Sequence, residues 1–243
     1  MTRRLEIEWP DPTPFGFRGG RSIRILAASD ETDPALDQLP NREALGSIDL
    51  IVGCGDLSPD RLCFLADAFR APLVFVRGNH DRGGPWPRPH NLPEPLAGSD
   101  LTSLPGIPLL GLPWPTGDRE TNRRDETAAW LQVVRLAAPR LLASTVPRLA
   151  RAGTPLLVLS HVPPLDAGDT PTDLYHRGFA AYRLLLDRLA PPLWLHGHTT
   201  MAARSTWQER HGRTLLANAT GSILVELSPP VSPATAPSSK RAA

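Results

Sequence analysis

The feature that most constrains this chain is a series of short aliphatic runs, each of which ends on polar residues. The runs cover residues 22–30 (SIRILAASD), 48–56 (IDLIVGCGD), 71–81 (APLVFVRGNHD), 154–164 (TPLLVLSHVPP) and 191–198 (PPLWLHGH). Apolar runs of this length without alternation are typical of strands that are buried on both faces. They predict a largely parallel sheet covered on both sides.

Helical patterns lie between these runs, at residues 34–45, 59–70, 125–151 and 178–190, and the third is interrupted at Pro139 and again near Pro147. Alternation of strands and helices indicates an α/β fold with parallel pairing. Residues 101–113 instead predict a hairpin that turns at Pro105 and Gly106, and residues 202–227 predict two or three antiparallel strands. A second, more antiparallel sheet is therefore expected.

The length of 243 residues, with 41% hydrophobic and 21% charged residues, predicts one globular domain. We expect an N-terminal arm at residues 1–20, a single domain at 21–227, and a disordered tail rich in Pro, Ser and Ala at 228–243. Two cysteines are too few for a disulfide framework.

The charge and hydropathy of the chain exclude several kinds of partner. A formal net charge of +1 provides no electrostatic footprint for nucleic acid or an anionic membrane. No apolar stretch approaches the roughly 18 residues that a membrane span needs, and the basic N-terminus lacks the apolar segment of a signal peptide. These features predict a cytoplasmic protein. A small phosphorylated ligand is compatible with this charge, because local geometry and not net charge binds such a ligand.

The polar residues at the ends of the runs are of the types that bind divalent cations. They are Asp30, Asp56, Asn79 with His80, His161, and His196 with His198. Ligands of α/β sheets bind at the carboxyl ends of strands, and we expect these side chains to meet at one edge of the sheet. Oxygen and imidazole ligands together suit Mn, Fe, Zn or Ni better than Ca or Mg. His196 is the exception, because we expect it to pack against or support the other residues.

The order of these endings resembles the calcineurin-like metallophosphoesterases. The matching pieces are GD at residues 55–56, GNHD at 78–81, a lone histidine after a strand at 161, and GH at 197–198. The segment SDETDPAL at residues 29–36 further resembles a bacterial subgroup that has SDExDP where the family more usually has DxH. The resemblance spans about residues 22–227. It implies a four-layer αββα sandwich, in which two mixed β-sheets are flanked by helices.

This resemblance also implies two adjacent metal sites bridged by Asp56. One site would be completed by Asn79, His161 and His198, all of which are present. We therefore expect one tightly bound divalent transition metal.

The other implied site is depleted in this chain. It would use Asp30 and Asp56, but Thr32 and Thr200 stand where the family has two histidine ligands. A neutral hydroxyl is a poor ligand for these metals. We therefore expect a second ion to be weakly bound or absent.

The activity implied by the resemblance is hydrolysis of a small phosphate ester by attack of metal-bound hydroxide. His80 resembles the family histidine that donates a proton to the leaving oxygen, and Asp81 would orient its imidazole. His176 and Arg177 follow the His161 strand and are candidates for contact with the substrate phosphate. The sequence leaves three substrate classes open: a phosphomonoester, a small phosphodiester and a nucleotide-type pyrophosphate.

A second interpretation stays open, in which the chain is a catalytically degenerate member of the family. Such a protein would bind a metal and a phosphorylated ligand without turnover. Thr32 and Thr200 favour this interpretation, whereas the presence of His80 beside a complete four-ligand site favours the hydrolase.

Overall fold

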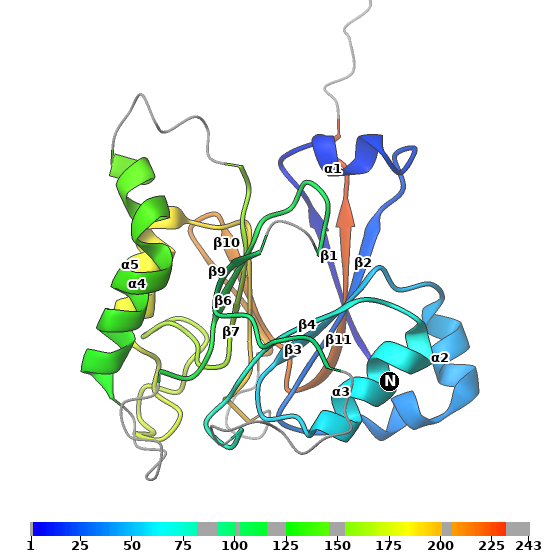
Figure 1. Cartoon of the computed structure of the whole chain (residues 1–243), viewed down its shortest axis with the longest axis horizontal. Coiled ribbons are helices and arrows are strands. Elements are labelled where there is room, and N and C mark those ends of the chain that lie inside the picture. Colours follow the sequence, from blue (N-terminus) through cyan, green and yellow to red (C-terminus); the bar gives the residue numbers. More distant parts are fainter. Residues whose placement is uncertain are drawn as a thin grey trace, which may run out of the picture.

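The structure, a computed structural model, describes residues 2–81, 92–100, 103–115, 125–145, 154–200 and 206–231, with side chains of the helix at 126–145 described as far as residue 138. Two mixed β-sheets pack face to face and helices cover their outer faces (Figure 1). The predicted four-layer αββα sandwich is therefore confirmed. None of the helices within the described ranges has the length and apolar character needed to cross a membrane.

The first sheet has five strands in the order β1-β11-β2-β3-β4. The strands are β1 (Arg3–Glu8), β11 (Gly221–Ser228), β2 (Ile23–Ser29), β3 (Leu50–Cys54) and β4 (Leu73–Val76). β11 pairs antiparallel with β2 and parallel with β1, and β2, β3 and β4 are mutually parallel.

The second sheet has six strands in the order β5-β6-β7-β8-β10-β9. The strands are β5 (Gly98–Asp100), β6 (Leu109–Leu112), β7 (Leu157–Ser160), β8 (Leu193–His196), β10 (Thr214–Asn218) and β9 (Gln208–His211). The four inner strands are parallel, and each edge strand is antiparallel to its neighbour. The predicted hairpin at residues 101–113 corresponds to β5 and β6, although β5 begins earlier in the chain and residues 101 and 102 lie outside the described ranges.

The helices are α1 (Thr13–Gly16), the 3-10 helix η1 (Pro34–Asp37), α2 (Leu39–Leu45), α3 (Pro59–Phe69), α4 (Glu126–Thr145) and α5 (Ala180–Leu189). Helices α2 and α3 lie on the outer face of the first sheet, and α4 and α5 lie on the outer face of the second (Figure 1). The inward side chains of both sheets form the central apolar core between them. Separate apolar clusters seal each helical layer to its sheet.

Two of the predicted helices differ from those in the structure. The predicted helix at 34–45 is divided into η1 and α2, because Gln38 is extended and Pro40 occupies the first turn of a new helix, where a missing N–H costs nothing. The predicted break at Pro139 is wrong, since α4 continues to Thr145. A proline removes one backbone hydrogen bond of the helix, and buried side chains such as Val133 hold α4 against the second sheet. Residues near Pro147 lie outside the described ranges.

Both ends of the chain contribute to the first sheet. Residues 1–20, predicted as an arm, contain β1, and Trp9 and Phe15 are buried in the central core, so this segment is part of the folded sheet. Of the predicted C-terminal antiparallel strands, β9 and β10 form a hairpin in the second sheet, but β11 crosses to the first. The remaining domain limits stay predictions, and most of the predicted tail, from residue 232, lies outside the described ranges.

The five apolar runs are confirmed as strands β2, β3, β4, β7 and β8. The expectation that they share one sheet is wrong, because the first three belong to the first sheet and the last two to the second. Backbone hydrogen bonds link the strand ends within each sheet, from Asp30 to Gly55 and from Gly197 to His161. The polar endings therefore meet where the carboxyl ends of strands from the two sheets lie together.

Candidate metal centre

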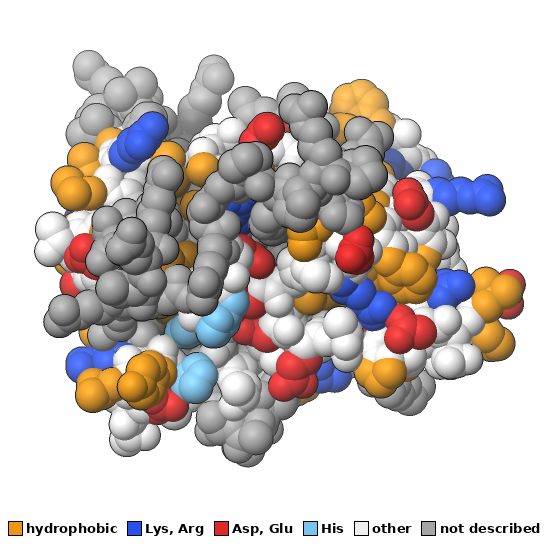
Figure 2. All heavy atoms as spheres, turned by 60° about the horizontal axis from the view of Figure 1, so that its bottom comes forward, with side chains coloured by type: hydrophobic (Ala, Val, Ile, Leu, Met, Phe, Trp, Pro, Cys, Tyr) orange, Lys and Arg blue, Asp and Glu red, His pale blue; other side chains and the backbone are white. Residues whose placement is uncertain are grey.

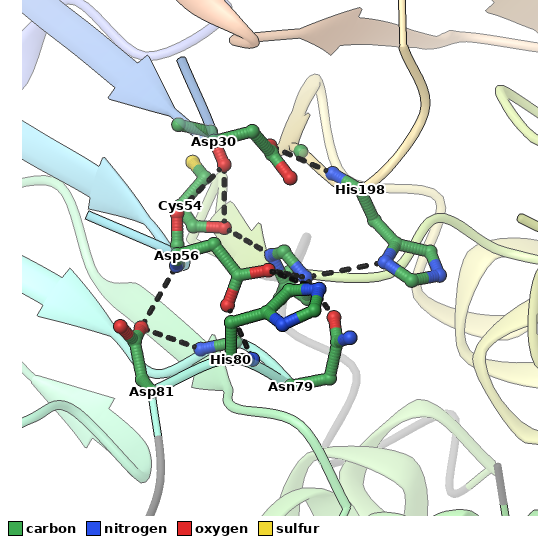
Figure 3. A network of polar contacts seen from close by, with 12 residues as sticks. Asp30, Cys54, Asp56, Asn79, His80, Asp81 and His198 are labelled. Atoms are coloured by element: carbon green, nitrogen blue, oxygen red, sulfur yellow. Dashed lines mark hydrogen bonds and ion pairs between the residues drawn. The ribbon is translucent and has the colours of Figure 1, made fainter. Parts of the chain in front are cut away.

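The polar residues predicted from the strand ends gather on one face of the molecule. Figure 2 shows histidine and acidic side chains next to one another on this face, and Figure 3 shows most of the cluster from close by. The structure brings together the predicted metal ligands and His80. These are Asp30 after β2, Asp56 after β3, Asn79 and His80 after β4, His161 after β7 and His198 after β8.

In the predicted complete site, three of the four residues surround one ring nitrogen of the fourth, His161. Nε2 of His161 lies 2.8 Å from Oδ1 of Asn79, 3.2 Å from Oδ2 of Asp56 and 3.2 Å from Nδ1 of His198. Two atoms that are each about 2.1 Å from a shared cation lie roughly 3 Å apart when they are adjacent ligands. The observed distances therefore fit one ion held by a carboxylate, a carboxamide and two imidazoles.

Backbone carbonyls orient both imidazoles of this site. Nδ1 of His161 lies 2.9 Å from the carbonyl oxygen of Cys54, and Nε2 of His198 lies 2.7 Å from that of Tyr175. A carbonyl oxygen can only accept, so these ring nitrogens donate their protons to it. When each ring is neutral, as a metal ligand must be, its opposite nitrogen has a lone pair directed into the site, which is the usual support for metal-binding histidines. This fixes Nε2 of His161 and Nδ1 of His198 as the donor atoms.

Asp56 and Asp81 order the two loops that follow β3 and β4. Oδ1 of Asp56 accepts the backbone N–H of His80 at 2.8 Å. Oδ2 of Asp81 accepts the backbone N–H groups of Asp56 and Gly78 at 2.8 and 2.9 Å (Figure 3). Asp81 was predicted to orient the imidazole of His80, but in the structure its carboxylate instead ties the two loop backbones together.

The imidazole of His80 is open to solvent beside the cluster. Its side chain is 76% exposed, and Nε2 lies 4.0 Å from Oδ2 of Asp56, whose side chain is only 7% exposed. A ring in this position can meet an incoming group without displacing any ligand of the site. This placement suits a proton donor that acts on a bound substrate.

The half that was predicted to be depleted has Asp30 as its own carboxylate and shares Asp56 with the other half. Asp30, Asp56 and His161 each offer a ligand atom, and these atoms lie within 4.8 Å of one another. Thr32 is exposed and Thr200 is half-buried. Without imidazoles at these positions, the described side chains supply this half with carboxylate oxygens and share His161 with the other half.

The two site histidines have opposite pKa shifts. Burial disfavours the charged form of His161, but the hydrogen bond to Asp56 and the negative charges of Asp30 and Asp56 outweigh it and raise its pKa to about 9. Burial and the charge of His161 lower the pKa of His198 to about 3. Burial also opposes ionisation of Asp56, yet the contacts with His161 lower the pKa of this carboxyl. The field at the centre therefore favours one positive charge beside ionised carboxylates, which is the environment that a cation needs.

The predicted phosphate contacts lie on the segment before α5. The ring centroid of His176 is 5.4 Å from that of His198, and Nδ1 of His176 is 2.5 Å from Oδ2 of Asp173. This places His176 beside the metal site. Nε of Arg177 is buried and has no hydrogen-bond partner among the described residues. Among the described residues, Arg177 has no hydrogen bond, ion pair or ring contact with the cluster, so its role stays a prediction.

Sequence reasoning missed Trp114, and it named Gly78 and Gly197 only as parts of the GNHD and GH motifs. The ring of Trp114 packs against those of His198 and His161, with centroids 5.5 and 6.3 Å apart, and forms an apolar wall. A Cβ on Gly78 would lie 2.2 Å from Oδ1 of Asp56, and one on Gly197 would lie 2.5 Å from Oδ2 of Asp30. Only glycine allows this close approach, so the glycine before the ligand in GN and in GH is the sequence signal for a tightly packed site. His196 is buried, in line with the packing role expected for it.

Comparison with known proteins identifies the family. The model of the calcineurin-like phosphoesterases matches residues 27–201, and the chain belongs to this family. A search of curated proteins finds no sequence match.

Solved structures resemble this chain at low sequence identity. A dimetal phosphatase from Danio rerio is 13% identical with a TM-score of 0.51, and the alignment covers 83% of this chain and 88% of that one. The protein TT1561 of Thermus thermophilus is 16% identical with a TM-score of 0.48, covering 82% and 90% of the two chains. Vacuolar Protein Sorting 29 from Cryptosporidium parvum is 14% identical with a TM-score of 0.42, covering 86% and 87%.

Proposed function

We propose that this protein is a metal-dependent phosphoesterase that hydrolyses a small phosphate ester and has one complete and one depleted metal site. Membership of the calcineurin-like phosphoesterase family supports the reaction class. The single observation that carries the proposal is the convergence of Asp56, Asn79 and His198 on Nε2 of His161. Four donors from four separate strand ends meet within ligand distances. Packing of the apolar core does not require such an arrangement, whereas metal binding does.

The donor set selects the class of cation and the chemistry that it supplies. Mixed nitrogen and oxygen ligands suit Mn, Fe, Zn or Ni. When bound, such a cation acts as a Lewis acid that polarises a phosphoryl oxygen and activates water for attack. Asp56 supplies negative charge to both halves, and the lone pairs of His161 and His198 face the complete half.

The residues around the site provide the other functions that hydrolysis needs. His80 is exposed next to Asp56 and is placed to give a proton to the leaving oxygen of the ester. Trp114 shields one side of the two ligand histidines from water. His176 lies beside His198 and is placed to contact a phosphate oxygen. All three side chains act without forming a covalent bond to the substrate, and no protein nucleophile is proposed.

The test is hydrolysis of chromogenic phosphate monoesters and diesters by the purified protein supplied with Mn or Ni. We expect activity in the wild type and a loss of at least about 100-fold in His161→Ala, since a ligand loss should exceed the 10–100-fold typical of supporting residues. His211→Ala is the matched control, because His211 on β9 is a histidine that pairs with Asp187 of α5 and not with the site residues. Equal activity in His161→Ala and the wild type would remove the proposed site.

A second candidate function is binding of a phosphorylated ligand without turnover. The observation that favours it is the presence of Thr32 and Thr200, which leave the depleted half with no imidazole of its own. The same assay separates the two functions when it is paired with a phosphate titration. Tight binding of one metal and of inorganic phosphate, without hydrolysis of monoesters, diesters or pyrophosphates with any metal, would favour the binding protein.

A further inference from the structure

In the connection between β10 and β11 the chain passes from the second sheet back to the first, beside the candidate metal centre. Asn218 at the end of β10 is in register with His196 on β8. Thr220 forms an isolated bridge with Ser29, and Gly221 then pairs with Ser29 at the start of β11. These partners precede His198 and Asp30 by one or two residues. The connection therefore lies against both halves of the centre.

Thr220 contacts the carboxylate of the depleted half directly. Its side chain is buried, and Oγ1 lies 3.1 Å from Oδ2 of Asp30 and 3.2 Å from the carbonyl oxygen of Thr199. A hydroxyl has one proton, and donation to an ionised carboxylate is the stronger of the two choices. The backbone N–H of His198 donates to the same Oδ2 at 2.9 Å. With both lone pairs of Oδ2 engaged, Asp30 has Oδ1 left to offer to a cation.

Asn218 holds the loop that carries His198. Its Nδ2 donates to the carbonyl oxygen of Thr199 at 2.6 Å and lies 3.1 Å from Oγ1 of the same residue. Its Oδ1 accepts the backbone N–H of Thr220 at 2.9 Å, and the N–H of Ala219 donates to the carbonyl of His196 at 2.7 Å. The carboxamide is thus used at both ends, in a buried position, to join the two chain segments.

The loop needs such support because of the backbone conformation of His198. Its φ of 68° lies in the left-handed region, which is unfavourable for a residue with a Cβ. In this conformation Nδ1 of His198 meets Nε2 of His161. A relaxed loop would move the ring away from its neighbours.

We infer that Asn218 and Thr220 are positioning residues of the metal centre. They hold the carboxylate of Asp30 and the backbone of His198 at a fixed separation, and so set the ligand geometry of the complete half from a segment that supplies no ligand. The inference rests on the proposed function, because it assigns these two residues a role at the proposed metal site. Its readout is metal affinity, which does not depend on turnover.

The experiment compares Thr220→Val with Thr220→Ser by titrating Mn²⁺ into metal-free protein, with calorimetry and Mn²⁺ electron paramagnetic resonance. Valine has nearly the same shape but no hydroxyl, whereas serine retains the donor. We expect the Mn²⁺ affinity to fall about 10-fold or more in Thr220→Val and to stay within about 2-fold of the wild type in Thr220→Ser, because the charge-assisted hydrogen bond is kept.

Thr214→Val is the matched control for burial and strand position. Thr214 is fully buried on β10, and its Oγ1 has no hydrogen-bond partner among the described residues. Loss of this hydroxyl should leave the Mn²⁺ affinity unchanged. A purely structural role for Thr220 predicts a lower unfolding temperature in Thr220→Val with an unchanged Mn²⁺ affinity, and that result would overturn the inference.

Asn218→Asp provides a second test if Thr220→Val does not fold. It keeps the shape of the side chain but replaces the donor to Thr199 with an acceptor, so we expect a loss of Mn²⁺ affinity at least as large. Wild-type affinity in both folded variants overturns the inference and leaves the proposed function intact. Mn²⁺ binding without hydrolysis in the wild type overturns the proposed function alone, and failure of the wild type to bind Mn²⁺ overturns both.

Discussion

The two halves of the proposed metal centre keep the same backbone frame but differ in ligand chemistry. The complete half collects a carboxylate, a carboxamide and two imidazoles, and its His161 is fully buried. In the depleted half, Oδ2 of Asp30 is held by the N–H of His198 and the hydroxyl of Thr220, and Thr32 is exposed. Protein donors thus compensate part of the negative charge that a second cation would neutralise.

This difference teaches that position and affinity are separable properties of a metal site. Asp30 has a left-handed φ of 56°, close to the 55° of Asp56, so both carboxylates leave their strands in the same way. The fold therefore places a carboxylate in each half regardless of what the neighbouring positions contain. Affinity for an ion depends on the additional donors, and these differ between the halves.

The largest effect should come from removing one carboxylate from each half in turn. Asp56→Asn should abolish tight metal binding and reduce hydrolysis by at least about 100-fold, whereas Asp30→Asn should reduce hydrolysis by about 10-fold and keep the tightly bound ion. The reason is that Asp56 contacts His161 directly at 3.2 Å, while one oxygen of Asp30 is already committed to protein donors. Metal content after dialysis and kcat/KM measure both. Equal losses would contradict the division into unequal halves.

Restoring imidazoles should erase the difference between the halves. The double substitution Thr32→His with Thr200→His adds two nitrogen ligands to the half that contains Asp30 and Asp56. We expect metal content to rise from about one to about two ions per chain, because mixed carboxylate and imidazole ligands bind these cations well. Elemental analysis by mass spectrometry gives the stoichiometry. Two tightly bound ions in the wild type, or no gain in the variant, would show that these threonines do not limit the second site.

Gly197→Ala should destabilise the frame that both halves share. A Cβ at this position would lie 1.9 Å from Oγ of Ser29 and 2.5 Å from Oδ2 of Asp30. We expect a loss of about 2 kcal/mol in the free energy of unfolding, as for other overpacked sites, measured by urea denaturation. Gly16→Ala is the control, because nothing lies within 4 Å of the added atom. Similar unfolding free energies for the two variants would argue against close packing at Gly197.

The smallest effect concerns Asp33, which anchors the segment carrying Asp30 and Thr32. Burial opposes its ionisation, but hydrogen bonds from Ser222, Ala35 and Thr2 lower the pKa of this carboxyl. Its stabilising contribution is therefore complete above the unfolded-state pKa and disappears as the pH falls through the lower folded-state pKa. Because the group is partly exposed, we expect Asp33→Asn to cost less than about 1 kcal/mol at neutral pH.

Urea denaturation of the wild type and Asp33→Asn at several pH values checks this prediction. The difference in unfolding free energy between them should shrink as the pH is lowered below the usual range of a carboxyl group. A difference that is independent of pH would show that the carboxylate charge does not contribute.

The fold and most of the site could be predicted because their signals are local. A strand buried on both faces needs a continuous apolar run, and β2, β3, β4, β7 and β8 all have one. The ligands follow those runs directly, so Asp56, Asn79, His161 and His198 were found as strand endings. The polar alternation of β1, in contrast, resembles that of an exposed segment, since this edge strand buries only Leu5 fully.

The secondary-structure elements and the candidate ligands follow from local sequence, because apolar runs and strand-end side chains are properties of adjacent positions. Three other features emerge only in the folded protein: the strands divide between two sheets, Asp81 binds backbone amides, and the carbonyls of Cys54 and Tyr175 orient the imidazoles. Nearly every residue has a backbone carbonyl and a backbone N–H, so these contacts cannot be predicted from residue types. They arise when segments far apart in the chain are brought together.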